Sequence, residues 1–169
     1  MEKRFSKWVK WTRLWDTKNN RWNPKRSRWT HEKIKELENI RSPGIYALAI
    51  SKKNINGNDF EFIKCIAYFG TTNSLKRRLS QFNNTLRGKK GHSGAVRFMH
   101  DYRNGKDLAR LLYVSVRPFK CEAGEITEKN LRMLGCVVKA EYEAWAEYVK
   151  RFKKLPKYNN RKTLKLGNK

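Results

Sequence analysis

The stretch Gly44-Ile45-Tyr46-Ala47-Leu48-Ala49-Ile50 is apolar or aromatic on both of its alternating faces, which is typical of a central strand. A second strand is predicted from Phe60 to Phe69 and a third from residue 111 to 116. Between the first two, Asn-Gly at the centre of residues 54–58 indicates a hairpin turn. We therefore expect an α/β fold of the α+β kind, with a small antiparallel three-stranded sheet flanked by helices.

The segment after the second strand has the pattern of an amphipathic helix. Asn73 is its predicted N-cap, and its apolar stripe has spacings of four, three and four: Leu75, Leu79, Phe82 and Leu86. Arg78 flanks this stripe, close enough to face the sheet. A basic loop at residues 87–91 follows, and His92 then opens a short helix that is expected to reach Tyr102.

The last periodic segment predicts a long helix with one acid in its apolar stripe, which comprises Leu131, Leu134, Val138, Trp145, Tyr148 and Phe152. Glu141 occupies the missing position of that stripe. A carboxylate on a buried face is costly unless a base, a hydrogen-bond network or a metal neutralises it. Glu141 is therefore interpreted as a functional acid, with pairing to a core Lys or Arg as the alternative. Gly135 leaves open whether the stripe is one helix or two.

Composition points to a polyanionic partner. The chain has 40 Lys and Arg against 15 Asp and Glu, a formal charge of +25 on 169 residues, which favours nucleic-acid binding. No apolar run approaches the length of a spanning helix and no signal peptide is visible, so no membrane partner is expected. Three cysteines without metal-site spacing are interpreted as reduced thiols of a cytoplasmic protein.

Residues 1–41 form a basic segment that holds five of the six tryptophans: Trp8, Trp11, Trp15, Trp22 and Trp29. Indoles among cations suit flexible nucleic acid, because bases stack on the rings while the cations follow the backbone. The alternative is that the first three tryptophans lie along one helical face and cover the core. At the other end, residues 161–169 form a basic tail.

Three motifs in order resemble the GIY-YIG nuclease family. They are Gly44-Ile45-Tyr46, Tyr68-Phe69-Gly70 and Leu75-Lys76-Arg77-Arg78, whose last arginine lies eight residues past Gly70. Pro156-Lys157-Tyr158-Asn159 matches the closing Pro-x-x-Asn of the family. The resemblance covers about residues 42–160, the expected nuclease domain, and it implies a metal-dependent endonuclease that hydrolyses DNA phosphodiester bonds.

The resemblance also implies roles for individual residues. Tyr46 would help to activate the attacking water with Tyr68 beside it, Arg78 would contact the scissile phosphate, and His92 would assist. A helix glutamate would bind one divalent ion, Mg²⁺ or another such as Mn²⁺. The apolar stripe selects Glu141 as this ligand, whereas the family's spacing to the closing asparagine selects Glu147.

Nucleic-acid contacts are expected from Arg77, Lys89, Lys90 and Asn159, with tying down the terminal segment as the alternative role of Asn159.

The chain has no carboxylate-rich cluster, no Cys/His set with zinc spacing and no Gly-rich phosphate loop, which argues against a two-metal nuclease, a zinc protein and a P-loop enzyme. Double-stranded DNA is the expected partner of a restriction-type, phage or mobile-element nuclease. A homodimer would serve double-strand cuts, and a catalytically silent binding module is the alternative.

Overall fold

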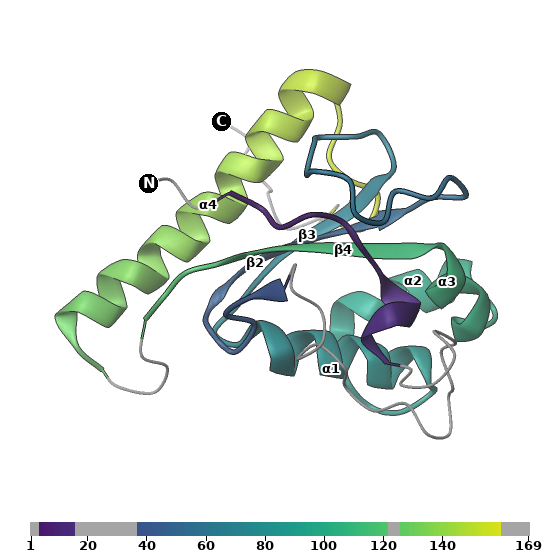
Figure 1. Cartoon of the computed structure of the whole chain (residues 1–169), viewed down its shortest axis with the longest axis horizontal. Helices are drawn as coiled ribbons and strands as arrows, with labels where there is room; N and C mark the ends of the chain where they lie inside the picture. The colour runs from purple at the N-terminus through teal and green to yellow at the C-terminus, as the bar shows by residue number, and fades with distance from the viewer. Residues whose placement is uncertain (1–3, 16–36, 122–125, 160–169) are drawn as a thin grey trace, which may run out of the picture.

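The computed structural model describes residues 4–15, 37–121 and 126–159. In chain order the elements are β1 (Val9–Lys10), the 3-10 helix η1 (Trp11–Leu14), β2 (Gly44–Ile50), β3 (Ile66–Thr72), α1 (Leu75–Leu86), α2 (Ser93–Asp101), α3 (Gly105–Leu111), β4 (Leu112–Pro118) and α4 (Glu128–Phe152). Helix α4 crosses one face of the sheet, and α1, α2 and α3 gather against the other (Figure 1). The α+β class predicted from the sequence is confirmed.

The sheet is antiparallel and has four strands in the order β1-β4-β2-β3, not the three that were predicted. The additional strand is β1, which pairs Val9 with Val114 of β4. Two residues are too few for an alternating pattern, so no hydrophobic periodicity marks this strand in the sequence. The sequence placed β2 correctly as a central strand, since β3 and β4 flank it.

The second strand begins later than predicted. It runs from Ile66 to Thr72, and residues 51–65 form the connection from β2. Phe60 and Phe62, which were assigned to the strand, instead pack as loop residues: the Phe60 ring stacks on Phe5 with centroids 4.0 Å apart and meets Phe62 edge-on at 5.3 Å. Aromatic residues suit a strand and an apolar loop equally, so the pattern could not separate the two.

Two hydrophobic cores lie on opposite faces of the sheet. Alternation along β2 sends Tyr46 and Leu48 toward α1 and α2, whereas Ile45 and its alternate neighbours pack toward α4. Trp11 and Trp15 join the first core and Trp8 the second, all buried. The covering role is therefore confirmed for these three tryptophans, through a strand and a 3-10 turn instead of one helical face. Trp22, Trp29 and the tail at 161–169 lie outside the described residues.

Helix α4 is continuous through Gly135, and its buried face differs from the predicted stripe. Leu131 and Val138 are 56% and 50% exposed. The hydrophobic residues buried against the sheet are Val137, Ala140, Ala144 and Tyr148. Alanines let the helix approach the sheet closely, but large apolar residues dominate a sequence pattern and shifted the predicted face around the helix. Glu141 is half-buried at the edge of the true face, not in its middle.

Smaller differences occur at helix starts. Ser74, not Asn73, is the N-cap of α1, and its hydroxyl accepts a hydrogen bond from the Arg77 backbone N–H at 3.4 Å. Helix α3 was not predicted, because Asn104 and Gly105 read as a turn; the Asn104 side chain instead caps the helix by accepting from the Lys106 N–H at 2.9 Å. Among the described residues, no helix combines the length and apolarity that a membrane crossing needs.

The free edge of the sheet is closed by the C-terminal segment. Asn159 is buried, and its side-chain amide mimics a strand: Oδ1 accepts from the Phe69 N–H and Nδ2 donates to the Phe69 carbonyl, each at 2.7 Å. The Tyr158 N–H donates to the Ala67 carbonyl at 2.9 Å. Strand β3 therefore has partners on both sides around Phe69.

Replacing Asn159 with alanine is expected to lower the free energy of unfolding by about 2–4 kcal/mol, because a buried N–H and a buried C=O of Phe69 lose their partners. Urea denaturation followed by circular dichroism measures the change. Asn58→Ala is the matched control; its side chain is exposed, and we expect a change within about 0.5 kcal/mol. Equal midpoints for the two variants would show that the Asn159 bonds do not stabilise the sheet.

Candidate active site

Tyr46 and His92 form a buried polar pair on the face of the sheet that α1 and α2 cover. The Tyr46 hydroxyl lies 3.0 Å from His92 Nε2. His92 is also the N-cap of α2, where its Nδ1 accepts from the Ala95 N–H at 3.1 Å. An accepting Nδ1 carries no proton, so the neutral ring holds its proton on Nε2 and donates it to the Tyr46 oxygen.

Tyr68 completes this cluster, and two glycines make room for it. Gly70 of β3 lies opposite Tyr46 in the strand register, and a Cβ there would come within 2.7 Å of the Tyr46 hydroxyl and of the Tyr68 ring. The two tyrosine rings lie 5.9 Å apart between centroids. A Cβ on Gly94 would likewise meet the His92 ring at 2.6 Å and the Tyr68 hydroxyl at 3.4 Å. The second tripeptide thus needs its glycine for packing.

Arg78 supplies the positive charge of the cluster. Its positive charge opposes the rise in the pKa of Tyr46 that burial causes and adds to the fall in the pKa of His92, so its field reaches both side chains. The Arg78 Nε is buried and finds no hydrogen-bond partner among the described residues. A buried N–H without a partner is costly, and an anion is the natural acceptor for a guanidinium.

Burial keeps Tyr46 and His92 uncharged. It is the largest cause of the raised pKa of Tyr46, to which Tyr68 and Glu141 add while Arg78 opposes them. Burial, followed by the Arg78 charge, lowers the pKa of His92 to about 4. Near neutral pH the cluster therefore holds a neutral phenol, a neutral imidazole and one guanidinium, an arrangement that attracts an anion.

The two candidate glutamates on α4 have different surroundings. Glu141 Oε2 accepts from the Thr71 hydroxyl at 3.4 Å, one residue beyond Gly70, and its charge raises the pKa of Tyr46. Glu147 accepts from Arg151 Nε at 2.7 Å, and this hydrogen bond lowers its own pKa. The structure thus brings Glu141, and not Glu147, into electrostatic contact with the Tyr46 cluster.

Thr71 is the site residue that sequence reasoning missed, although it directly follows the second tripeptide. The Glu141 carboxylate and the Thr71 hydroxyl are hard oxygen donors, and these fit Mg²⁺ or Mn²⁺, which keep water and take phosphate oxygens as further ligands. Within the ranges that the structure describes, no three or more His, Cys, Asp or Glu side chains form a metal-holding group. The donor set is thus that of a site with one carboxylate.

Of the four residues predicted to contact nucleic acid, three are exposed and one is buried. Lys89 and Lys90 are exposed on the loop that leads into His92. Arg77 is exposed on α1 and donates from Nη2 to Asn73 Oδ1 at 2.6 Å. Asn159 is buried, and its amide is engaged by the Phe69 backbone, as expected for a residue that ties down the terminal segment.

Two surface clefts lie away from this cluster. One, of about 580 Å³, lies between α4 and the aromatic loop around Phe60; the other, of about 670 Å³, lies at the opposite end of β3 from Gly70. Tyr46, His92 and Arg78 line neither of them. The Tyr46 cluster therefore lies outside both clefts, whereas Glu147, the alternative candidate for the ion ligand, lines the first.

We expect an NMR titration of the ring nitrogens to find His92 neutral, with its proton on Nε2, down to about pH 4. Arg78→Gln should raise the pKa of His92 toward 6.5, because the repelling charge is removed. Arg77→Gln, one residue away and exposed, is the control and should leave the pKa unchanged. An unchanged value in both variants would mean that Arg78 does not act on His92.

The same shift sets a pH dependence of stability. The folded-state pKa lies below the ordinary 6.5, so as pH falls the unfolded chain binds this proton first. The His92 contribution therefore lowers the free energy of unfolding as pH drops from about 6.5 to about 4, and leaves it unchanged above that window.

No protein-family model, curated protein or solved structure matches the chain. A function is therefore inferred from the sequence motifs and from the side chains gathered around Tyr46.

Proposed function

We propose that the protein is a divalent-metal-dependent endonuclease of the GIY-YIG type that hydrolyses DNA phosphodiester bonds. The observation that carries this proposal is the Tyr46–His92 hydrogen bond beside Arg78, whose buried Nε lacks a partner among the described residues. The formal charge of +25 favours a polyanionic substrate, because it draws the phosphate backbone to the surface.

Arg78 is proposed to bind the scissile phosphate. A planar guanidinium offers parallel donors to two phosphoryl oxygens and stabilises the charge that grows on them in the transition state. Tyr46 and His92 are neutral, so they do not compete with the phosphate for this cation. The half-buried position of Arg78 strengthens the contact, because fewer waters screen it.

Tyr46 is proposed to orient the attacking water. The Nε2–H of His92 donates to the Tyr46 oxygen, which leaves the phenol's own O–H available to another acceptor. A hydrogen bond with Tyr68 is among the causes that raise the pKa of Tyr46, so the second tyrosine is in reach of that proton. His92 thus acts as a positioning residue, and the two phenols form a short path for a proton.

Glu141 and Thr71 would hold the divalent ion, Mg²⁺ or Mn²⁺. Such an ion, when bound, supplies Lewis acidity at a phosphoryl oxygen and at the leaving oxygen. Glu141 is joined to the edge strand through Thr71, which keeps the carboxylate on the same strand end as Gly70. Helix α4 and strand β3 would therefore position the two halves of the site.

A catalytically silent nucleic-acid-binding module is the second candidate. The complete burial of the Tyr46 side chain favours it, because a buried phenol has no direct access to water. Under this alternative the Tyr46 cluster is a polar part of the core, and the basic surface holds nucleic acid without cutting it.

Incubation with supercoiled plasmid and Mg²⁺ is expected to give nicked or linear product, and EDTA should abolish it. Arg78→Ala, Glu141→Ala and Tyr46→Phe should each lower the cutting rate by about 100-fold or more, because phosphate binding, the ion site or the water contact is lost. Arg110→Ala, an exposed arginine of α3, and Glu147→Ala are the matched controls, and both should cut at the wild-type rate.

The outcomes separate the alternatives, provided that thermal unfolding confirms that each variant is folded. Cutting that survives in Glu141→Ala and is lost in Glu147→Ala would move the ion site to Glu147. Tight, salt-sensitive DNA binding without cutting under any divalent ion would leave the binding module as the function.

A further inference from the structure

The cleft of about 670 Å³ at the Ile66 end of β3 has a basic rim. Three lysines and three tyrosines among its lining residues define what we name the lysine cleft: Lys64, Lys154, Lys157, Tyr102, Tyr148 and Tyr158. Ile66 and Ala67 also line it, so one wall belongs to the same edge strand that carries Gly70 and Thr71.

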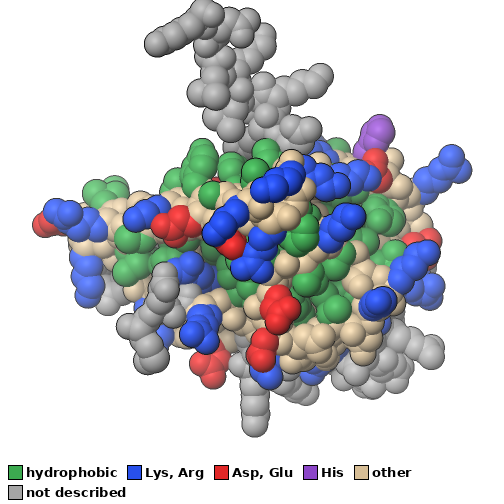
Figure 2. Space-filling view, turned by 90° about the horizontal axis from the view of Figure 1, so that it is seen from above, with side chains coloured by type: hydrophobic (Ala, Val, Ile, Leu, Met, Phe, Trp, Pro, Cys, Tyr) green, Lys and Arg blue, Asp and Glu red, His purple; other side chains and the backbone are tan. Residues whose placement is uncertain are grey.

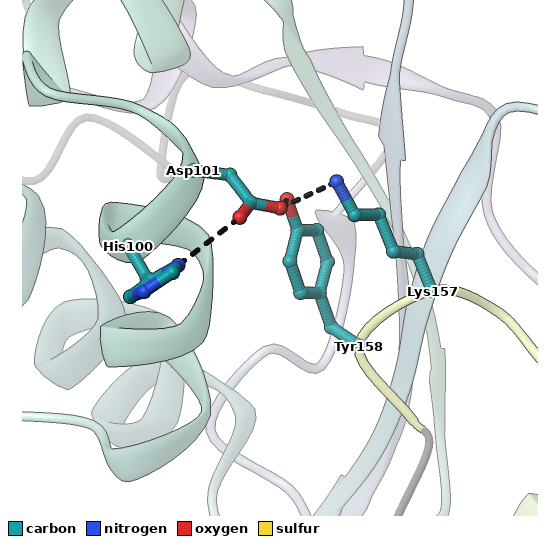
Figure 3. A network of polar contacts seen from close by, with 4 residues as sticks. All are labelled: His100, Asp101, Lys157 and Tyr158. Atoms are coloured by element: carbon teal, nitrogen blue, oxygen red, sulfur yellow. Dashed lines mark hydrogen bonds and ion pairs between the residues drawn. The ribbon is translucent and has the colours of Figure 1, made fainter.

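The walls of the lysine cleft are fixed by hydrogen bonds. The Tyr148 hydroxyl from α4 is 3.0 Å from the Lys64 carbonyl and 3.2 Å from the Ile66 carbonyl, to which it donates. Tyr158 donates its hydroxyl to Asp101 at 2.8 Å, and the ammonium of Lys157 pairs with the same carboxylate (Figure 3). The hydrogen bond from Lys157 is the main cause that lowers the pKa of Asp101 to about 2. The cleft is therefore held open by a network that stays ionised at neutral pH.

The charge of the cleft is only partly compensated. None of its lining residues carries a carboxylate, and of its three lysines Asp101 pairs only with Lys157. Lys64 and Lys154 form no ion pair with any described residue, whereas acids along α4 are paired, such as Glu143 with Lys139 and Glu147 with Arg151. Lys and Arg side chains are spread across the face seen in Figure 2, with acidic side chains in a few places. Two free ammonium groups in a concave, tyrosine-lined wall focus a positive field and suit an anion.

The position of the cleft relates it to the proposed ion site. Ala67 and Thr71 are four residues apart on β3, which corresponds to about 13 Å along a strand. Thr71 contacts Glu141 of the proposed ion site, so the lysine cleft and that site adjoin opposite ends of the same strand.

We propose that the lysine cleft binds a backbone phosphate of the DNA outside the proposed cutting site. The binding of DNA phosphates by Lys64 and Lys154 rests on the charge and shape of the cleft. That the bound DNA is also the substrate of the enzyme rests in addition on the proposed function.

The binding test uses a labelled duplex and the full chain in EDTA, so that no cutting takes place. The double variant Lys64→Ala/Lys154→Ala is compared with Lys106→Ala/Lys129→Ala, which removes the same charge from exposed lysines of α3 and the opposite end of α4. We expect the cleft variant to weaken binding about tenfold or more and to lower the slope of log K against log salt by about two, one for each lost contact. Equal losses in the two variants would overturn the proposal, since charge alone would then explain them.

The position test uses duplexes with a single neutral methylphosphonate at successive positions. A neutral linkage at a position away from the cut should weaken binding of the wild-type protein and have no further effect on the cleft variant. If no position distinguishes the two proteins, the cleft does not bind a backbone phosphate. If plasmid is never cut but the cleft variant binds DNA more weakly than the wild type, the endonuclease proposal fails and the phosphate site stands. If the cleft variant binds DNA as tightly as the wild type and the wild type cuts plasmid, the phosphate site is wrong and the endonuclease proposal stands.

Discussion

The two hydrogen bonds between the Asn159 amide and the Phe69 backbone are the constraint on which the arrangement of the site depends. Strand β3 lies at the edge of the sheet, and an edge strand has one side without a ladder. A slip of one residue in this strand would turn Tyr68 toward α4 and place a side chain where Gly70 meets Tyr46. By pinning Phe69 between these two residues, Asn159 keeps the tyrosine on one face and the glycine in register.

Electrostatics complements this packing. Burial holds Tyr46 and His92 in their neutral forms, so Arg78 keeps a charge that neither of them neutralises. At the other end of the same strand, Lys64 and Lys154 line a cleft without a carboxylate. The edge strand therefore lies between two places that favour an anion, and a polyanion is the ligand class that would engage both together.

The sequence correctly predicted the elements whose large apolar residues are the ones that are buried. Strand β2 is buried on both faces, and the apolar stripe of α1 is fully buried, so the periodicity of each is visible in the sequence. Helix α4 has small residues on its buried face and large apolar ones beside it, so the predicted face was wrong while the helix itself was found. The resemblance to the GIY-YIG family predicted Tyr46, Tyr68, Arg78 and His92 as site residues, and the structure brings these side chains together. The contact of Thr71 with Glu141 comes from tertiary packing of α4 on β3, to which no local pattern refers.

The sheet contains contacts from segments near both ends of the described chain, so it can be completed only late in translation. Val9 pairs with Val114, and Asn159 bonds to a residue 90 positions earlier. The pairing of β1 with β4 becomes possible once residue 114 has left the ribosome, whereas β3 keeps a bare edge until residue 159 has emerged. Contacts of such long separation make folding slow. The register of Tyr68 and Gly70 is thus secured only after synthesis has passed residue 159.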